Sequence, residues 1–112
     1  MLFRSIRVIS VVGRFLEHSR IYYFHAAGEQ KVYCSSADLM DRNLYRRVET
    51  CFPVEEPSLK ARLISEGLEA YLEDNTGAWR LGADGEYKKV YSRGAKRNAQ
   101  RSLLARLSDP HT

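Results

Sequence analysis

The period of the hydrophobic residues changes close to Pro53, and this change limits the fold more than any other feature. Upstream of Pro53, short apolar and aromatic runs are rich in β-branched residues, which is typical of strands. These runs cover residues 5–12, 20–25, 31–34 and 46–52. Downstream, apolar residues recur at the spacing of one helical face: Leu59, Leu63, Ile64, Leu68, Tyr71 and Leu72. The chain therefore combines strands with helices.

Turn residues divide the strands into hairpins. Ala27-Gly28 separates the second strand from the third, and Asp84-Gly85 separates two short runs further along the chain. A last helix over residues 95–107 places Ala99, Leu103 and Leu107 on one side. We predict the α/β (α+β) class, with a mixed β-sheet flanked by helices and with a C-terminal β-hairpin and helix.

The predicted sheet has too few helices to cover it. The first strand is apolar on most of its surface, as in sheets that are buried on both faces, but only one long helix and one terminal helix follow. We therefore expect that the chain is part of a larger unit, or that it forms a homo-oligomer through an exposed sheet edge.

Length and charge describe a small basic chain. The 112 residues are enough for one domain, 1–112, and the formal net charge is +4. Thirteen of the 18 cationic residues are Arg, whose planar fork fits phosphate, although a GC-rich genome explains the count equally well. Residues 88–112 hold seven cations and one anion, so this segment attracts polyanions.

Several classes of protein are excluded by what the sequence lacks. No apolar run is long enough to span a membrane, and the N-terminal run is interrupted by arginine, unlike a secretory signal. Cys34 and Cys51 lack the paired spacing of a zinc site, and no metal-ligand pattern, Walker loop or dinucleotide-binding glycine motif is present. We expect a cytoplasmic protein with reduced thiols and no metal site of its own.

The first candidate site is the His18-Ser19-Arg20 stretch. If the second strand already begins there, alternation places His18 and Arg20 on one face. An imidazole beside a fixed cation can hold a phosphoryl oxygen and move a proton. The alternative is a histidine that caps a turn. His25 is interpreted as structural, and His111 lies in the C-terminal tail.

A second candidate cluster follows the third strand. Ser36 belongs to a Ser-Ser-Ala-Asp stretch, and Arg42 and Arg47 come soon after it. Hydroxyls and backbone amides at a strand end, followed by arginines, predict an anion cradle. The alternative for Arg47 is a salt bridge to Glu49, which shares its face if Arg47 begins the fourth strand.

Long motifs in these segments resemble the C-terminal end of the large polyphosphate kinases. The resemblance is carried, in this order, by Val11–Phe24, Tyr33–Leu44, Arg46–Glu49, Asp74–Trp79 and Asp84–Tyr87. It covers nearly the whole chain. The family makes polyphosphate reversibly from ATP, with magnesium and through a phosphohistidine, so the resemblance implies ATP or ADP and Mg²⁺ as cofactors of the full-length enzyme.

The resemblance also implies a fold and roles for residues. The chain resembles the latter part of the second of two phospholipase D-like domains, so it is a partial phospholipase D-like domain without the nucleophilic histidine. His18 matches a histidine near the phosphates that assists proton transfer, Arg47 matches a phosphate-contacting arginine, and Arg42 matches a supporting basic position. The chain departs from the family at Leu39, usually Trp, and at Tyr45, usually Asp.

These observations lead to one expected function and two alternatives. We expect a C-terminal part of a polyphosphate kinase that binds polyphosphate or nucleotide phosphates through His18, Arg20, Ser36, Arg42 and Arg47. Alone, it is expected to have no kinase activity and no bound cofactor, and to need the remaining kinase domains as partners. The alternatives are a dimeric phospholipase D-like phosphodiesterase and a non-catalytic polyanion-binding accessory domain. Nucleic acid is not the expected ligand.

Overall fold

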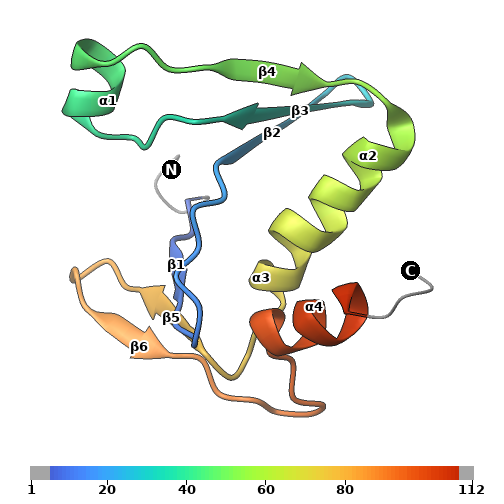
Figure 1. Ribbon diagram of the computed structural model, residues 1–112. Coiled ribbons are helices and arrows are strands. Elements are labelled where there is room, and N and C mark those ends of the chain that lie inside the picture. Colours follow the sequence, from blue (N-terminus) through green and yellow to red (C-terminus); the bar gives the residue numbers. More distant parts are fainter. Residues whose placement is uncertain (1–5, 109–112) are drawn as a thin grey trace. The chain divides into compact units, whose positions relative to one another are not determined.

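The computed structural model describes residues 6–108, which form two compact units (Figure 1). The hairpin unit comprises residues 17–68, and the terminal unit comprises residues 6–16 and 69–108. The predicted α+β class is confirmed, but the strands do not join in one mixed sheet. They form two three-stranded sheets in which all pairs are antiparallel. Two of these pairs are hairpins joined by short turns, whereas parallel pairs need long crossovers.

The hairpin unit contains the sheet β2-β3-β4. Strands β2 (Ile21–Ala26) and β3 (Glu29–Ser35) are joined by a two-residue turn, and β4 (Cys51–Val54) pairs with the other side of β3. Ala27 and Gly28 both have left-handed backbone conformations, with φ of 52° and 79°. This turn geometry matches the twist of the flanking strands, so the predicted hairpin is confirmed.

The segment between β3 and β4 differs from the predicted fourth strand. Helix α1 (Asp41–Arg46) occupies its beginning, and β4 begins only at Cys51, so the strand predicted over residues 46–52 starts too early. Instead, β4 continues through Pro53, which pairs with Tyr33. Proline lacks the N–H that a central strand needs, but β4 lies at the edge of its sheet, where that donor can be spared.

The predicted helix after Pro53 is present in three consecutive segments. They are α2 (Pro57–Arg62), the π-helical segment η2 (Leu63–Glu69) and α3 (Ala70–Leu72). The π-helical turn shifts the side-chain spacing, and Leu59 and Leu72 at the two ends of the predicted apolar face are 52% exposed. Among residues 6–108, no helix has both the length and the apolar character needed to span a membrane.

The terminal unit contains the second sheet, with the order β1-β5-β6. Strand β1 (Ile9–Val11) pairs with β5 (Ala78–Leu81), which continues through a tight turn into β6 (Tyr87–Lys89). In this turn, Asp84 accepts a hydrogen bond from Glu86 N, and φ is 83° at Gly85, a value that favours glycine. The predicted C-terminal hairpin is therefore confirmed.

The first strand is shorter and more exposed than its apolar sequence predicts. The predicted run begins at Ser5, which lies outside the described residues, as does His111. Ile6 and Val12, on either side of β1, are 69% and 63% exposed. The expectation of a strand buried on most of its surface is wrong for the described part, because no element within residues 6–108 covers these side chains.

A buried carboxylate joins the loop before β5 to helix α4 (Ala99–Leu107). Asp74 is 4% exposed, and its two oxygens accept backbone N–H groups from Thr76, Gly77 and Ala99 at 2.7–3.0 Å. The helix predicted over residues 95–107 begins only at Ala99, because the side chain of Asn98 caps it. The Asp-Asn-Thr-Gly motif is therefore explained by local structure.

Candidate anion-binding site

The two predicted site segments lie side by side in the hairpin unit. His18 and Arg20 immediately precede β2, and Ser36 immediately follows β3. The carbonyl of Arg20 accepts a hydrogen bond from Ser35 N at 3.0 Å, which extends the pairing of β2 with β3 beyond the strand ends. Hairpin geometry thus brings together residues that are 16 or more positions apart in the sequence.

An ion pair links these two segments. The Nε–H of Arg20 donates to Oδ1 of Asp38 at 2.6 Å, a charge-assisted hydrogen bond. This hydrogen bond is the main reason why the pKa of Asp38 is lowered and that of Arg20 is raised. The charges of His18 and Arg42 also lower the pKa of Asp38, so three basic side chains act on one carboxylate.

The acidity of Asp38 gives a testable prediction. Since its folded-state pKa is lowered, the pair with Arg20 stabilises the protein above the unfolded-state pKa, and this contribution is lost as pH falls through the folded-state pKa. In a carboxyl-carbon NMR titration, Asp38 should titrate below the usual pKa of an aspartate. Arg20→Ala should raise the midpoint, whereas Arg62→Ala on α2 should leave it unchanged. An ordinary midpoint in the parent chain would contradict the prediction.

The hydroxyl of Ser36 already has partners within the unit. Its Oγ donates to Oε2 of Glu49 at 2.5 Å and accepts from Thr50 N at 2.9 Å. Ser36 N in turn donates to Thr50 O at 2.9 Å. Ser36 therefore holds the segment that precedes β4 in place. A phosphate could accept a hydrogen bond from the Ser36 hydroxyl only by displacing Glu49.

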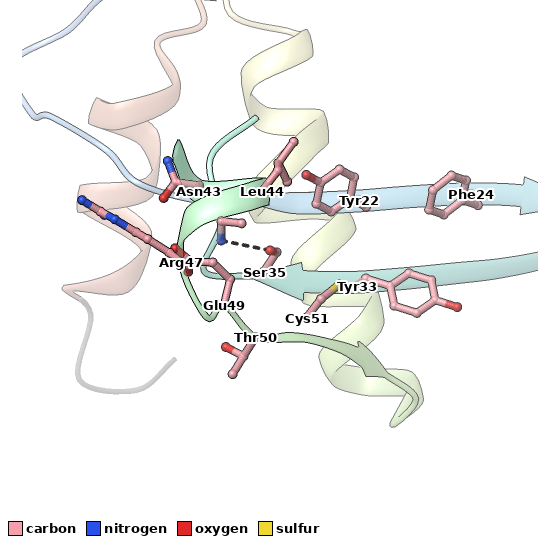
Figure 2. A pocket seen from close by; sticks show the side chains of 11 residues that line it. Tyr22, Phe24, Tyr33, Ser35, Asn43, Leu44, Arg47, Glu49, Thr50 and Cys51 are labelled. Atoms are coloured by element: carbon pink, nitrogen blue, oxygen red, sulfur yellow. Dashed lines mark hydrogen bonds between the residues drawn. The ribbon is translucent and has the colours of Figure 1, made fainter. Parts of the chain in front are cut away.

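Arg47 lies at one end of a cleft of about 570 Å³ between α1 and the sheet (Figure 2). Figure 2 shows aromatic side chains along the strands and Arg47 at the opposite end. The lining residues are Tyr22, Phe24, Tyr33, Ser35, Ala37, Asn43, Leu44, Arg47, Glu49, Thr50 and Cys51. The cleft is thus mainly aromatic and aliphatic, with polar groups on α1 and on the segment before β4.

Arg47 forms no ion pair with any described residue. Its backbone is extended at the end of α1 and does not belong to a strand. Glu49 instead accepts a hydrogen bond from the hydroxyl of Ser36. The alternative of a salt bridge from Arg47 to Glu49 is therefore not what this structure shows. Arg42 is likewise exposed on α1 and has no ion pair within the described part of the chain.

Two features of this site were not singled out by residue patterns. The sequence patterns place Asp38 only in a serine-rich stretch, although it pairs with Arg20 and its pKa is lowered by the charges of His18 and Arg42. Asn43 is 4% exposed, and its Nδ2 has no hydrogen-bond partner among the described residues. Its burial could not be read from a polar segment that shows no apolar period.

Within residues 6–108, no three His, Cys, Asp or Glu side chains lie together in a way that could hold a metal ion. The basic groups around Asp38 and the free Arg47 suit an anion instead.

Comparison with known proteins identifies relatives over almost the whole chain. Residues 2–101 match the family described as "Polyphosphate kinase C-terminal domain 2". Proteins named polyphosphate kinase from Burkholderia cenocepacia (strain HI2424) and Paraburkholderia phytofirmans are 56% and 52% identical over 105 residues, which are 94% of this chain and 15% of each relative. The chain therefore spans about 15% of the length of these curated relatives.

A solved structure has the same fold. The crystal structure of polyphosphate kinase from Porphyromonas gingivalis is similar with a TM-score of 0.86 and 40% sequence identity. The match covers 93% of this chain and 16% of that chain.

Proposed function

The chain belongs to the polyphosphate kinase C-terminal domain 2 family, and from this premise we propose that it provides phosphate-binding and acid–base groups to a polyphosphate kinase. The proposed reaction is the reversible transfer of the terminal phosphate of ATP to polyphosphate. The proposed partners are the phosphates of polyphosphate or of a nucleotide and the remaining domains of the kinase. A cytoplasmic location and association through a sheet edge belong to the same proposal.

The observation that supports this proposal most is the set of basic groups around Asp38. His18, Arg20 and Arg42 act on this one carboxylate, and Arg47 has no ion pair within residues 6–108. A transferring phosphoryl group gathers negative charge on its oxygens, and preorganised cations stabilise that charge without reorganising. In this proposal Arg20, Arg42 and Arg47 bind phosphate.

His18 is proposed to move a proton or to bind a phosphoryl oxygen. It is exposed, and its side chain forms no hydrogen bond with a described residue, so the ring is open to a ligand. ATP or ADP and Mg²⁺ are proposed only for the complete enzyme, where the ion would neutralise phosphate charge. Because the described residues bring no three candidate ligands together, no step is assigned to the metal.

Titration of the chain with tripolyphosphate at low salt tests the proposal. We expect weak binding that is lost at high salt, since phosphate contacts are largely electrostatic. Arg47→Ala should reduce the affinity about tenfold, because it removes one charge-assisted hydrogen bond of ordinary strength. Combining it with His18→Ala should reduce the affinity further. Isothermal calorimetry or NMR shift mapping gives these affinities.

Arg62→Ala is the matched control, because it removes the same charge from α2, where Arg62 pairs with Glu66. Its affinity should stay within twofold of the parent. An unchanged affinity after the double substitution, or no binding at low salt, would refute the proposed site. Hydrolysis of a phosphodiester by the chain would instead favour the phospholipase D-like alternative.

A further inference from the structure

The contact between Arg20 and Asp38 uses only part of the guanidinium. Asp38 accepts from Nε, the inner nitrogen, at 2.6 Å. A guanidinium has five N–H groups, so four remain on the two outer nitrogens. These outer nitrogens donate to no other described residue. The Arg20 side chain is 26% exposed, so it is partly accessible to a ligand.

The backbone around Asp38 is held in place on both sides. Before it, Ala37 N donates to the hydroxyl of Ser35 at 3.0 Å. After it, Met40 N donates to the carbonyl of Asp38 at 2.8 Å. Ser35 N itself donates to the carbonyl of Arg20. Asp38 is therefore a fixed acceptor whose position relative to the backbone of Arg20 is set by the hairpin.

A carboxylate in this place has two opposite effects on an anionic ligand. Its negative charge repels the anion, which weakens binding. Its hydrogen bond restricts a long, flexible arginine to one orientation, which reduces the entropy lost when the outer nitrogens meet the ligand. Arg20 is the residue on which the second effect depends, so the two effects can be separated by substitution.

We propose that Asp38 is a positioning residue, which holds the inner Nε of Arg20 so that the outer nitrogens of the guanidinium meet a phosphoryl oxygen. This inference rests on the proposed function, because the ligand is the phosphate chain proposed above. Asp38 itself does not touch the ligand. It acts through Arg20. The charges of His18 and Arg42 also act on Asp38.

A double-mutant cycle with tripolyphosphate as the probe separates positioning from charge. Asp38→Asn keeps the size of the side chain and removes its charge. In the parent chain it should reduce the affinity about tenfold, because the neutral amide oxygen is a weaker acceptor and holds Arg20 less firmly. In the Arg20→Ala background it should raise the affinity or leave it unchanged, because only the repulsion is then removed. An increase in both backgrounds would show a purely electrostatic role and overturn the inference.

Asp41→Asn is the matched control, since it removes one carboxylate from the exposed first turn of α1 without breaking an ion pair of the described residues. It should not reduce the affinity. Asp38→Glu, which keeps the charge, should restore part of the loss. Thermal unfolding of each variant identifies any that fails to fold.

The Nε–H resonance of Arg20 in ¹⁵N NMR spectra provides a readout without ligand. In the parent chain this proton should exchange slowly with water, and in Asp38→Asn, whose neutral amide oxygen is a weaker acceptor, it should exchange faster. Rapid exchange in the parent would overturn the inference. If the parent does not bind tripolyphosphate, the proposed function fails, and slow exchange of this proton would still establish the pair itself.

Discussion

Replacing Asp74 with alanine is expected to lower the free energy of unfolding of the terminal unit by about 3 kcal/mol. The carboxylate accepts three backbone N–H groups and is 4% exposed, so its removal leaves these donors without partners in a place that water reaches poorly. It also removes a negative charge from the N-terminus of α4. Urea unfolding followed by the fluorescence of Trp79, the only tryptophan, measures the loss.

Glu73→Ala is the control for this experiment, because it removes a neighbouring carboxylate that is 58% exposed and pairs with Arg97 at 3.3 Å. Exposed ion pairs contribute little, so the change should stay within about 0.5 kcal/mol. Asp74→Asn should have an intermediate effect, since an amide keeps one oxygen acceptor but presents N–H groups to another donor. Equal stabilities of the alanine variant and the parent would show that the three hydrogen bonds are not needed.

Local turn chemistry made both hairpins predictable from the sequence. Ala27, Gly28 and Gly85 adopt the left-handed conformations that these tight turns require, and each turn fixes the register of the strands beside it. The helix after Pro57 was predictable for a similar reason, because its apolar period is long. Where the signal is local, the sequence was sufficient.

The misplaced strands show where local signals fail. Residues 46–52 contain β-branched residues, yet α1 extends to Arg46 and β4 runs through Pro53 at a sheet edge. Whether a proline interrupts a strand depends on whether another strand lies beside its nitrogen and needs an N–H donor there. That is set by the tertiary structure. The same limit applies to Val12, whose exposure depends on what covers the sheet rather than on its own run of residues.

The sequence patterns singled out basic residues but not the ion pair between Arg20 and Asp38. Basic groups at His18, Arg20 and Arg42 do gather around one carboxylate, but that carboxylate is Asp38, which lies 18 residues from Arg20. Sequence alternation instead pointed to a short-range pair of Arg47 with Glu49. Such long-range pairing becomes visible only once the register of β2 and β3 is known.

Gly77→Ala should destabilise the terminal unit by roughly 3 kcal/mol, because the added methyl group has no room. A Cβ at this position would lie 2.4 Å from the carbonyl oxygen of Val12, a backbone atom that cannot move aside like a side chain. Val12 N also donates to the carbonyl of Gly77 at 2.8 Å, so any shift of the two segments breaks the pairing beside β1 and β5. Trp79 fluorescence during urea unfolding measures the effect.

Gly94→Ala is the matched control for this substitution, because a Cβ there meets no heavy atom within 4 Å and the backbone is not left-handed. Both variants reduce backbone freedom in the unfolded chain equally, which by itself favours the folded state by up to about 1 kcal/mol. The control should therefore be as stable as the parent or slightly more stable. If Gly77→Ala matched it, the close approach to Val12 would have to relax at no cost, and β1 would not depend on this glycine.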